Sequence, residues 1–106
     1  DQFEANLPPY LFDKIAPTIP TSLALKLAKS SASATVTLSW AASSDNLAVT
    51  GYNIYRNGKK IGKTDSTNFK DTLSGAASGT LYSYTVKAFD NAGNLSLPSS
   101  TVSIVY

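Results

Sequence analysis

The residues best equipped to bind a ligand lie on one predicted hairpin, in the stretch GYNIYRNGKK that begins at residue 51. They are one aromatic ring and three cations: Tyr55, Arg56, Lys59 and Lys60. An aromatic face can stack on a sugar and cations can pair with an anionic polymer, so polysaccharide or a cell surface is a candidate ligand. The alternative is structural, because lysines on an edge strand prevent edge-to-edge pairing between sheets. We favour the structural interpretation, since binding along a polymer requires several interleaved exposed rings.

Catalysis is not predicted, because the usual catalytic groups are missing or unpaired. The 106 residues include no histidine and no cysteine. This composition excludes the usual general base, the cysteine nucleophile and the commonest transition-metal ligands. The seven acidic residues show no evident pair, whereas hydrolysis of a glycosidic bond needs two carboxyl groups across a cleft. We therefore expect a non-enzymatic protein without catalytic residues or cofactors.

Composition predicts one small globular domain. The chain is 42% apolar and 15% charged, which suits the single hydrophobic core that a chain of this length can bury. The net charge is only +2, too small to drive binding to a phosphate backbone, so nucleic acid is not an expected partner. No apolar run has the length of a membrane span, so a membrane is not an expected partner either.

The start of the chain is predicted to be a linker. Four of the five prolines fall within the first twenty residues, and proline favours extended chain. We therefore assign residues 1–16 to a proline-rich interdomain linker and residues 17–106 to the folded domain. The bulky apolar residues 10–12 are expected to contact a neighbouring module. Because the chain starts with Asp1 and not with methionine, we expect it to be part of a longer protein.

From residue 21 onward, apolar residues recur with a period of two, which is typical of half-buried β-strands. Clusters rich in Gly, Ser, Asn and Asp separate these runs and predict turns. Asn57 and Gly58 both tolerate a positive φ, so they predict a tight type I′ hairpin. Together these features favour an antiparallel β-sandwich or a small barrel. The inward positions are Leu23, Leu25, Leu27, Val36, Leu38, Trp40, Tyr52, Ile54, Tyr82, Tyr84, Val86, Ala88, Val102 and Ile104.

Four segments together resemble the fibronectin type III domain, in the version found between modules of secreted bacterial polysaccharide-degrading enzymes. They are APTIP at 16–20, DNLAVTGY at 45–52, YRNG at 55–58 and GTLYSYTVKAFDNAGN at 79–94. The likeness covers about residues 13 to 106 and rests on many weak matches in the right order.

This resemblance implies an all-β, seven-stranded immunoglobulin-like sandwich, with a three-stranded sheet (first, second and fifth strands) packed on a four-stranded sheet. Trp40 and Tyr52 would help to fill the core. Tyr82 would be the tyrosine corner, with its hydroxyl bonded to upstream backbone.

The implied topology also brings two polar loops to the pole where the linker enters. These loops carry oxygen atoms of the kind that calcium prefers, on Asp45, Asn46, Asp90, Asn91 and Asn94. The alternative is that Asp and Asn bond their own turns. We favour turn chemistry and expect no metal, because the spacing lacks the dense acidic repeat of a dedicated calcium loop.

The resemblance implies a non-catalytic, monomeric, extracellular module that spaces or docks neighbouring modules of a larger bacterial carbohydrate-active enzyme. Its partners would be the adjacent modules of the same polypeptide. The alternative function is binding of carbohydrate or a cell surface through Tyr55 and the basic hairpin.

Overall fold

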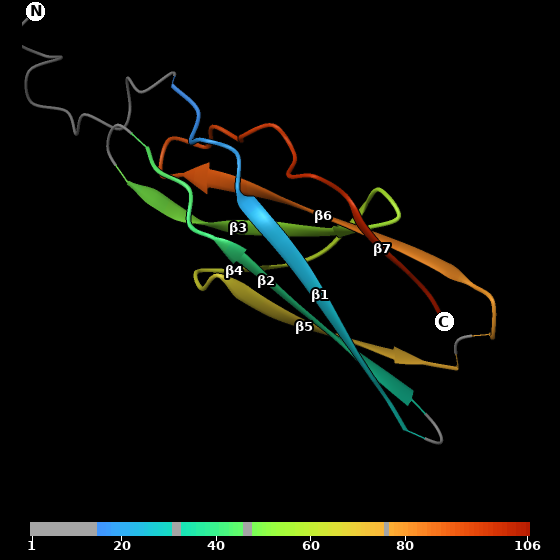
Figure 1. The fold of residues 1–106 in the computed structure, drawn as a ribbon. Helices are drawn as coiled ribbons and strands as arrows, with labels where there is room; N and C mark the ends of the chain where they lie inside the picture. Colours follow the sequence, from blue (N-terminus) through green and yellow to red (C-terminus); the bar gives the residue numbers. More distant parts are fainter. Residues whose placement is uncertain (1–14, 31–32, 46–47, 76) are drawn as a thin grey trace, which may run out of the picture.

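The computed structural model describes residues 15–30, 33–45, 48–75 and 77–106. Within these ranges the chain forms seven β-strands (Figure 1). Their bounds are β1 Thr21–Lys29, β2 Ser33–Ala41, β3 Val49–Arg56, β4 Lys59–Thr64, β5 Asn68–Ser74, β6 Leu81–Asp90 and β7 Val102–Val105.

The strands form two antiparallel sheets, whose strands run side by side in Figure 1. One sheet has three strands in the order β1-β2-β5, and the other has four in the order β4-β3-β6-β7. The predicted fold class and the predicted membership of the three-stranded sheet are therefore confirmed. β4 and β7 are the edges of the four-stranded sheet.

The core lies between the sheets and is built from the apolar half of each alternating strand. Trp40 is only 6% exposed, and its ring meets that of Tyr52 edge to face, with centroids 5.3 Å apart. The Tyr52 hydroxyl accepts a hydrogen bond from the backbone N–H of Ser43 at 2.9 Å. The buried hydrophobic residues in the described ranges are Ala34, Val36, Leu38, Trp40, Tyr52, Ile54, Leu73, Tyr84, Val86 and Ala88.

The β3–β4 hairpin has the predicted turn. Asn57 and Gly58 have φ values of 52° and 82°, which is the left-handed conformation that a type I′ turn requires at both central positions. The hairpin therefore joins β3 to the edge strand β4, which carries Lys59, Lys60 and Lys63. That these lysines prevent pairing with another sheet stays a prediction.

The connection from β6 to β7 uses serine side chains to complete the sheet. Ser96 Oγ accepts a hydrogen bond from the N–H of Ala88, and Ser99 Oγ accepts one from the N–H of Val86, both at 2.9 Å. The N–H groups of the two serines donate in turn to the carbonyls of Ala88 and Val86. Backbone groups of β6 that would otherwise be buried without partners are thereby satisfied.

Residues ahead of β1 also pack on the sandwich. Pro17 and Pro20 are buried, and the N–H of Thr18 donates to the carbonyl of Ser44 at 2.8 Å. The linker residues 1–14, including the expected contacts at 10–12, lie outside the described residues. The boundary between linker and domain therefore stays a prediction.

Among the described tyrosines of β6, it is Tyr84 whose hydroxyl donates a hydrogen bond, to Asp71 Oδ2 at 2.7 Å. Tyr82 is half-buried, and the guanidinium carbon of Arg56 lies 5.9 Å from its ring centroid. The bond expected from the Tyr82 hydroxyl to upstream backbone is not found within the described part of the chain. The structure thus supports a packing role for Tyr82 beside Arg56, and it does not support the hydrogen bond of a tyrosine corner.

Candidate functional site

The four residues predicted to form a ligand surface on the hairpin do not share one face. Tyr55 is half-buried on the outer face of the four-stranded sheet, with the Lys87 ammonium 5.2 Å from its ring centroid. Arg56 instead points between the sheets, where its Nη1 donates to Asp71 Oδ2 at 2.7 Å. Grouping Arg56 with Tyr55 was wrong, because neighbouring residues of a strand point to opposite faces.

Arg56 belongs to a polar network at one end of the core. Asp71 Oδ2 accepts hydrogen bonds from both Arg56 and the hydroxyl of Tyr84. The hydrogen bond with Asp71 raises the pKa of the Arg56 guanidinium. Burial, followed by the hydrogen bond to Asp71, raises the pKa of the Tyr84 hydroxyl above its ordinary value of 10.0. Both donors therefore keep their protons, and the network crosslinks the two sheets.

The two lysines of the predicted surface are exposed at the start of β4. Lys60 pairs in register with Tyr55, and Lys59 pairs with Arg56. Of the predicted ligand surface, the structure therefore brings together Tyr55 and Lys60 on the outer face. Their use by a ligand stays a prediction.

Three of the candidate calcium donors, at the end of β6 and in the loop after it, already make hydrogen bonds to the protein. Asp90 Oδ1 accepts from the N–H of Asn94 at 2.9 Å and Asp90 Oδ2 accepts from its side-chain amide at 3.0 Å. Asn91 Oδ1 accepts from the hydroxyl of Thr50 at 2.9 Å. The bonds between Asp90 and Asn94 are those expected of turn chemistry, whereas the bond of Asn91 joins the loop to β3.

The other two predicted donors lie in the loop between β2 and β3. Both carboxylate oxygens of Asp45 are buried and have no hydrogen-bond partner in the described ranges, and Asn46 lies outside those ranges. No group of three or more His, Cys, Asp or Glu side chains among the described residues is arranged to hold a metal ion. The expectation of turn chemistry without a bound metal stays a prediction, and calcium remains its alternative.

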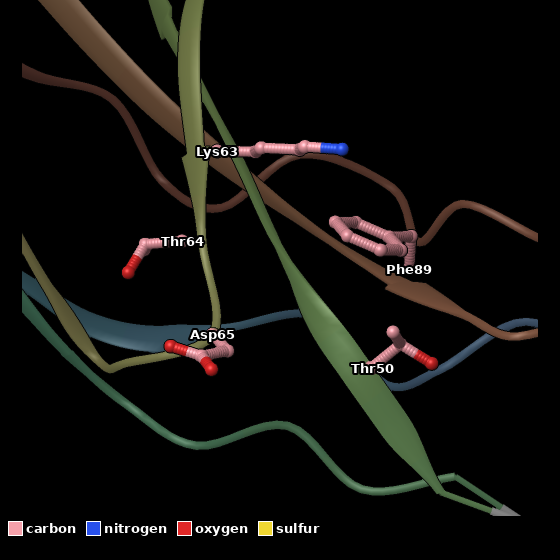
Figure 2. Close-up of a pocket in the computed structure, with 5 residues that line it drawn as sticks. All are labelled: Thr50, Lys63, Thr64, Asp65 and Phe89. Atoms are coloured by element: carbon pink, nitrogen blue, oxygen red, sulfur yellow. The ribbon is translucent and has the colours of Figure 1, made fainter.

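A surface that sequence reasoning missed lies on the outer face of the four-stranded sheet, around Phe89. A hollow of about 400 Å³ is lined there by residues of β3, β4 and β6 and by Asp65 just after β4. In Figure 2 the side chains of Lys63 and Thr50 flank Phe89, whereas those of Thr64 and Asp65 point away from it. A sequence signal could have found this surface. Residues 81, 83, 85 and 87 are predicted to point outward, and because alternate residues of a strand share a face, Phe89 should point outward with them. The lining residues are Thr50, Lys63, Thr64, Asp65 and Phe89.

Comparison with known proteins identifies the family. Residues 26–104 match the family described as the β-sheet domain of rhamnogalacturonan I lyases. The crystal structure of an Fn3-like protein from Clostridium thermocellum is 32% identical with a TM-score of 0.67, and the match covers 87% of this chain and 95% of that one. The chain belongs to the fibronectin type III family. The family predicted from the sequence is therefore confirmed.

Longer relatives contain this fibronectin type III domain as a small part. Exoglucanase B of Cellulomonas fimi is 45% identical over 87% of this chain, which covers 8% of that protein. Chitinase A1 of Niallia circulans is 47% identical over 87% of this chain, which covers 12% of that protein. The domain thus spans roughly a tenth of the curated relatives it matches. Nowhere in its described ranges does a helix have the length and apolar character needed to cross a membrane.

Proposed function

We propose that this fibronectin type III domain is a non-catalytic spacer between modules of a larger extracellular bacterial enzyme that degrades polysaccharide. The observation that carries this proposal is the share of each relative that the domain covers, 8% of an exoglucanase and 12% of a chitinase. A segment of that size leaves most of each relative for other modules. The adjacent modules of the same polypeptide would be its partners.

The sandwich suits this role because its geometry is rigid. Its core is filled by interlocking side chains from both sheets, and the network at Asp71 ties β3 and β6 to β5. β6 has ten residues and so spans roughly 33 Å at the usual rise of an antiparallel strand. Modules attached at its two ends would be held at about that separation.

The proposal is tested by deleting residues 17–106 from the parent enzyme while keeping its linkers. We expect kcat/KM on a soluble oligosaccharide to change by less than about twofold, because the deleted domain contributes no catalytic group. The rate on insoluble polysaccharide should fall severalfold, because the distance between linked modules sets their effective concentration on one surface.

The matched control replaces residues 17–106 with an unrelated fibronectin type III domain of equal length, which should restore the rate on insoluble polysaccharide. A deletion that abolished hydrolysis of the soluble oligosaccharide would show that the domain supplies part of the active site. The spacer proposal would then be wrong.

A further inference from the structure

Phe89 has an aromatic ring on the outer face of the four-stranded sheet, away from the buried core. It pairs in register with Gly51 of β3. A Cβ atom added to Gly51 would lie only 2.8 Å from Phe89 Cζ, so the ring lies directly over the glycine backbone. Because Gly51 has no side chain, the Phe89 ring packs flat across the neighbouring strand β3. The ring is half-buried there, so part of it is accessible to a ligand.

Polar groups surround this ring in the hollow of Figure 2. The side chain of Lys63 extends past one side of Phe89, and Thr50 lies on the other side. The Thr50 hydroxyl is already oriented, because it donates to Asn91 Oδ1 at 2.9 Å. Asp65 follows β4 and lines the hollow, but its carboxylate points away from Phe89 in Figure 2. The hollow therefore offers an ammonium donor and a hydroxyl oxygen that can accept, on either side of an apolar ring.

A second hollow of about 280 Å³ lies against the same ring and shares Lys63 with the first. Its walls include Asn53, which is 8% exposed although it points outward. Leu95 forms the far wall and is held there by its bridge to Phe89. Phe89 and Lys63 thus line two adjacent hollows, which together form an extended site across the sheet.

A pyranose ring has the chemistry that matches this arrangement. Its axial C–H groups make an apolar face that can stack on an aromatic side chain, and its hydroxyls can both donate and accept hydrogen bonds. Sites for small ligands typically combine an apolar surface with a few placed polar groups. Two adjacent hollows on either side of one ring would suit successive sugar units of a chain.

We infer that Phe89 and the two hollows beside it are a saccharide-binding site for the pyranose units of a polysaccharide. One sugar ring stacks on Phe89, the Lys63 ammonium donates to a sugar oxygen, and the Thr50 hydroxyl oxygen accepts from a sugar hydroxyl. The site borders the predicted hairpin surface at Lys60, which lines the second hollow, but it does not include Tyr55, and it adds substrate contact to the role of a spacer. Either property can hold without the other.

The test is an NMR titration of the 106-residue chain with three hexasaccharides: cellohexaose, chitohexaose and hexagalacturonate. Binding of at least one should shift the amide signals of Gly51, Lys63 and Phe89. Phe89→Ala should weaken binding about tenfold, the loss expected when a stacking ring is removed, whereas Phe89→Tyr should retain it. Binding of the neutral sugars identifies a neutral polymer, and binding of hexagalacturonate that disappears at high salt identifies an acidic one.

A second pair of variants decides the result if Phe89→Ala does not fold. Lys63→Ala should weaken binding severalfold, while Lys70→Ala, at an exposed lysine of the other sheet that lines neither hollow, should not. The inference is overturned if none of the three sugars binds at millimolar concentration. It is also overturned if binding survives Phe89→Ala but is lost in Tyr55→Ala, which would locate the site on the hairpin.

Discussion

Trp40→Ala is expected to lower the free energy of unfolding by about 3–5 kcal/mol, as for other buried aromatic residues replaced by alanine. The indole is 6% exposed, and its ring lies 5.3 Å from that of Tyr52. The substitution leaves a cavity between the sheets, where Tyr52 loses its edge-to-face partner. A domain of this size has only about 5–15 kcal/mol of stability to lose. Urea denaturation at equilibrium, followed by circular dichroism, measures the effect.

Trp40→Phe is the matched variant for this prediction. It keeps an aromatic ring beside Tyr52 and removes the indole N–H, which is buried without a hydrogen-bond partner in the described ranges. Because a buried unsatisfied donor is itself unfavourable, Trp40→Phe should cost less than half as much as Trp40→Ala. A melting temperature left unchanged by Trp40→Ala would show that the registers of β2 and β3 are wrong.

Asp71→Ala is expected to have the second largest effect, about 2–3 kcal/mol. Asp71 accepts hydrogen bonds from Arg56 and Tyr84 through one carboxylate oxygen, each at 2.7 Å. Loss of one partner from a fully buried ion pair costs about 3–5 kcal/mol. We expect the smaller cost of about 2–3 kcal/mol here because the Arg56 side chain is 31% exposed, so water can replace part of the lost interaction. The Tyr84 hydroxyl is fully enclosed and would be left without an acceptor.

Two further variants separate the parts of this effect. Asp71→Asn keeps a side-chain oxygen for Tyr84 but removes the charge, so it should fall between the natural protein and Asp71→Ala. Asp65→Ala removes an exposed carboxylate and should change stability by less than about 0.5 kcal/mol. If Asp71→Ala and Asp65→Ala were equally stable in urea, the hydrogen bonds of Asp71 would not stabilise the fold as predicted.

The sequence predicts the core of this fold well because the signal is local. A period of two identifies the inward face of a strand without knowledge of its neighbours, so Trp40, Tyr52 and Tyr84 were assigned correctly from their own segments. The turn at Asn57 and Gly58 is equally local, since it depends only on the φ values those two residues tolerate. The arrangement of strands into sheets came from the family resemblance, because pairing between distant segments leaves little trace in one sequence.

The surface is harder to predict because it depends on contacts between distant segments. The outward Asn53 is buried because it lies in the hollow closed by Leu95 and Gly93 of a later loop. Alternation alone places Arg56 on the face opposite Tyr55, but nothing near Arg56 in the sequence reveals that its partner there is Asp71, across the sandwich. The sequence alone does not single out Phe89, because the position of its ring depends on Gly51, which lies opposite it in another strand.

The measurement that tests the spacer role most directly is the maximum dimension of the parent enzyme in solution, by small-angle X-ray scattering. Deletion of residues 17–106 should shorten the particle by roughly 30 Å, the length of β6, and an unrelated fibronectin type III domain in its place should restore the length. An unchanged maximum dimension after deletion would contradict the account, because the domain would then not hold its neighbours apart.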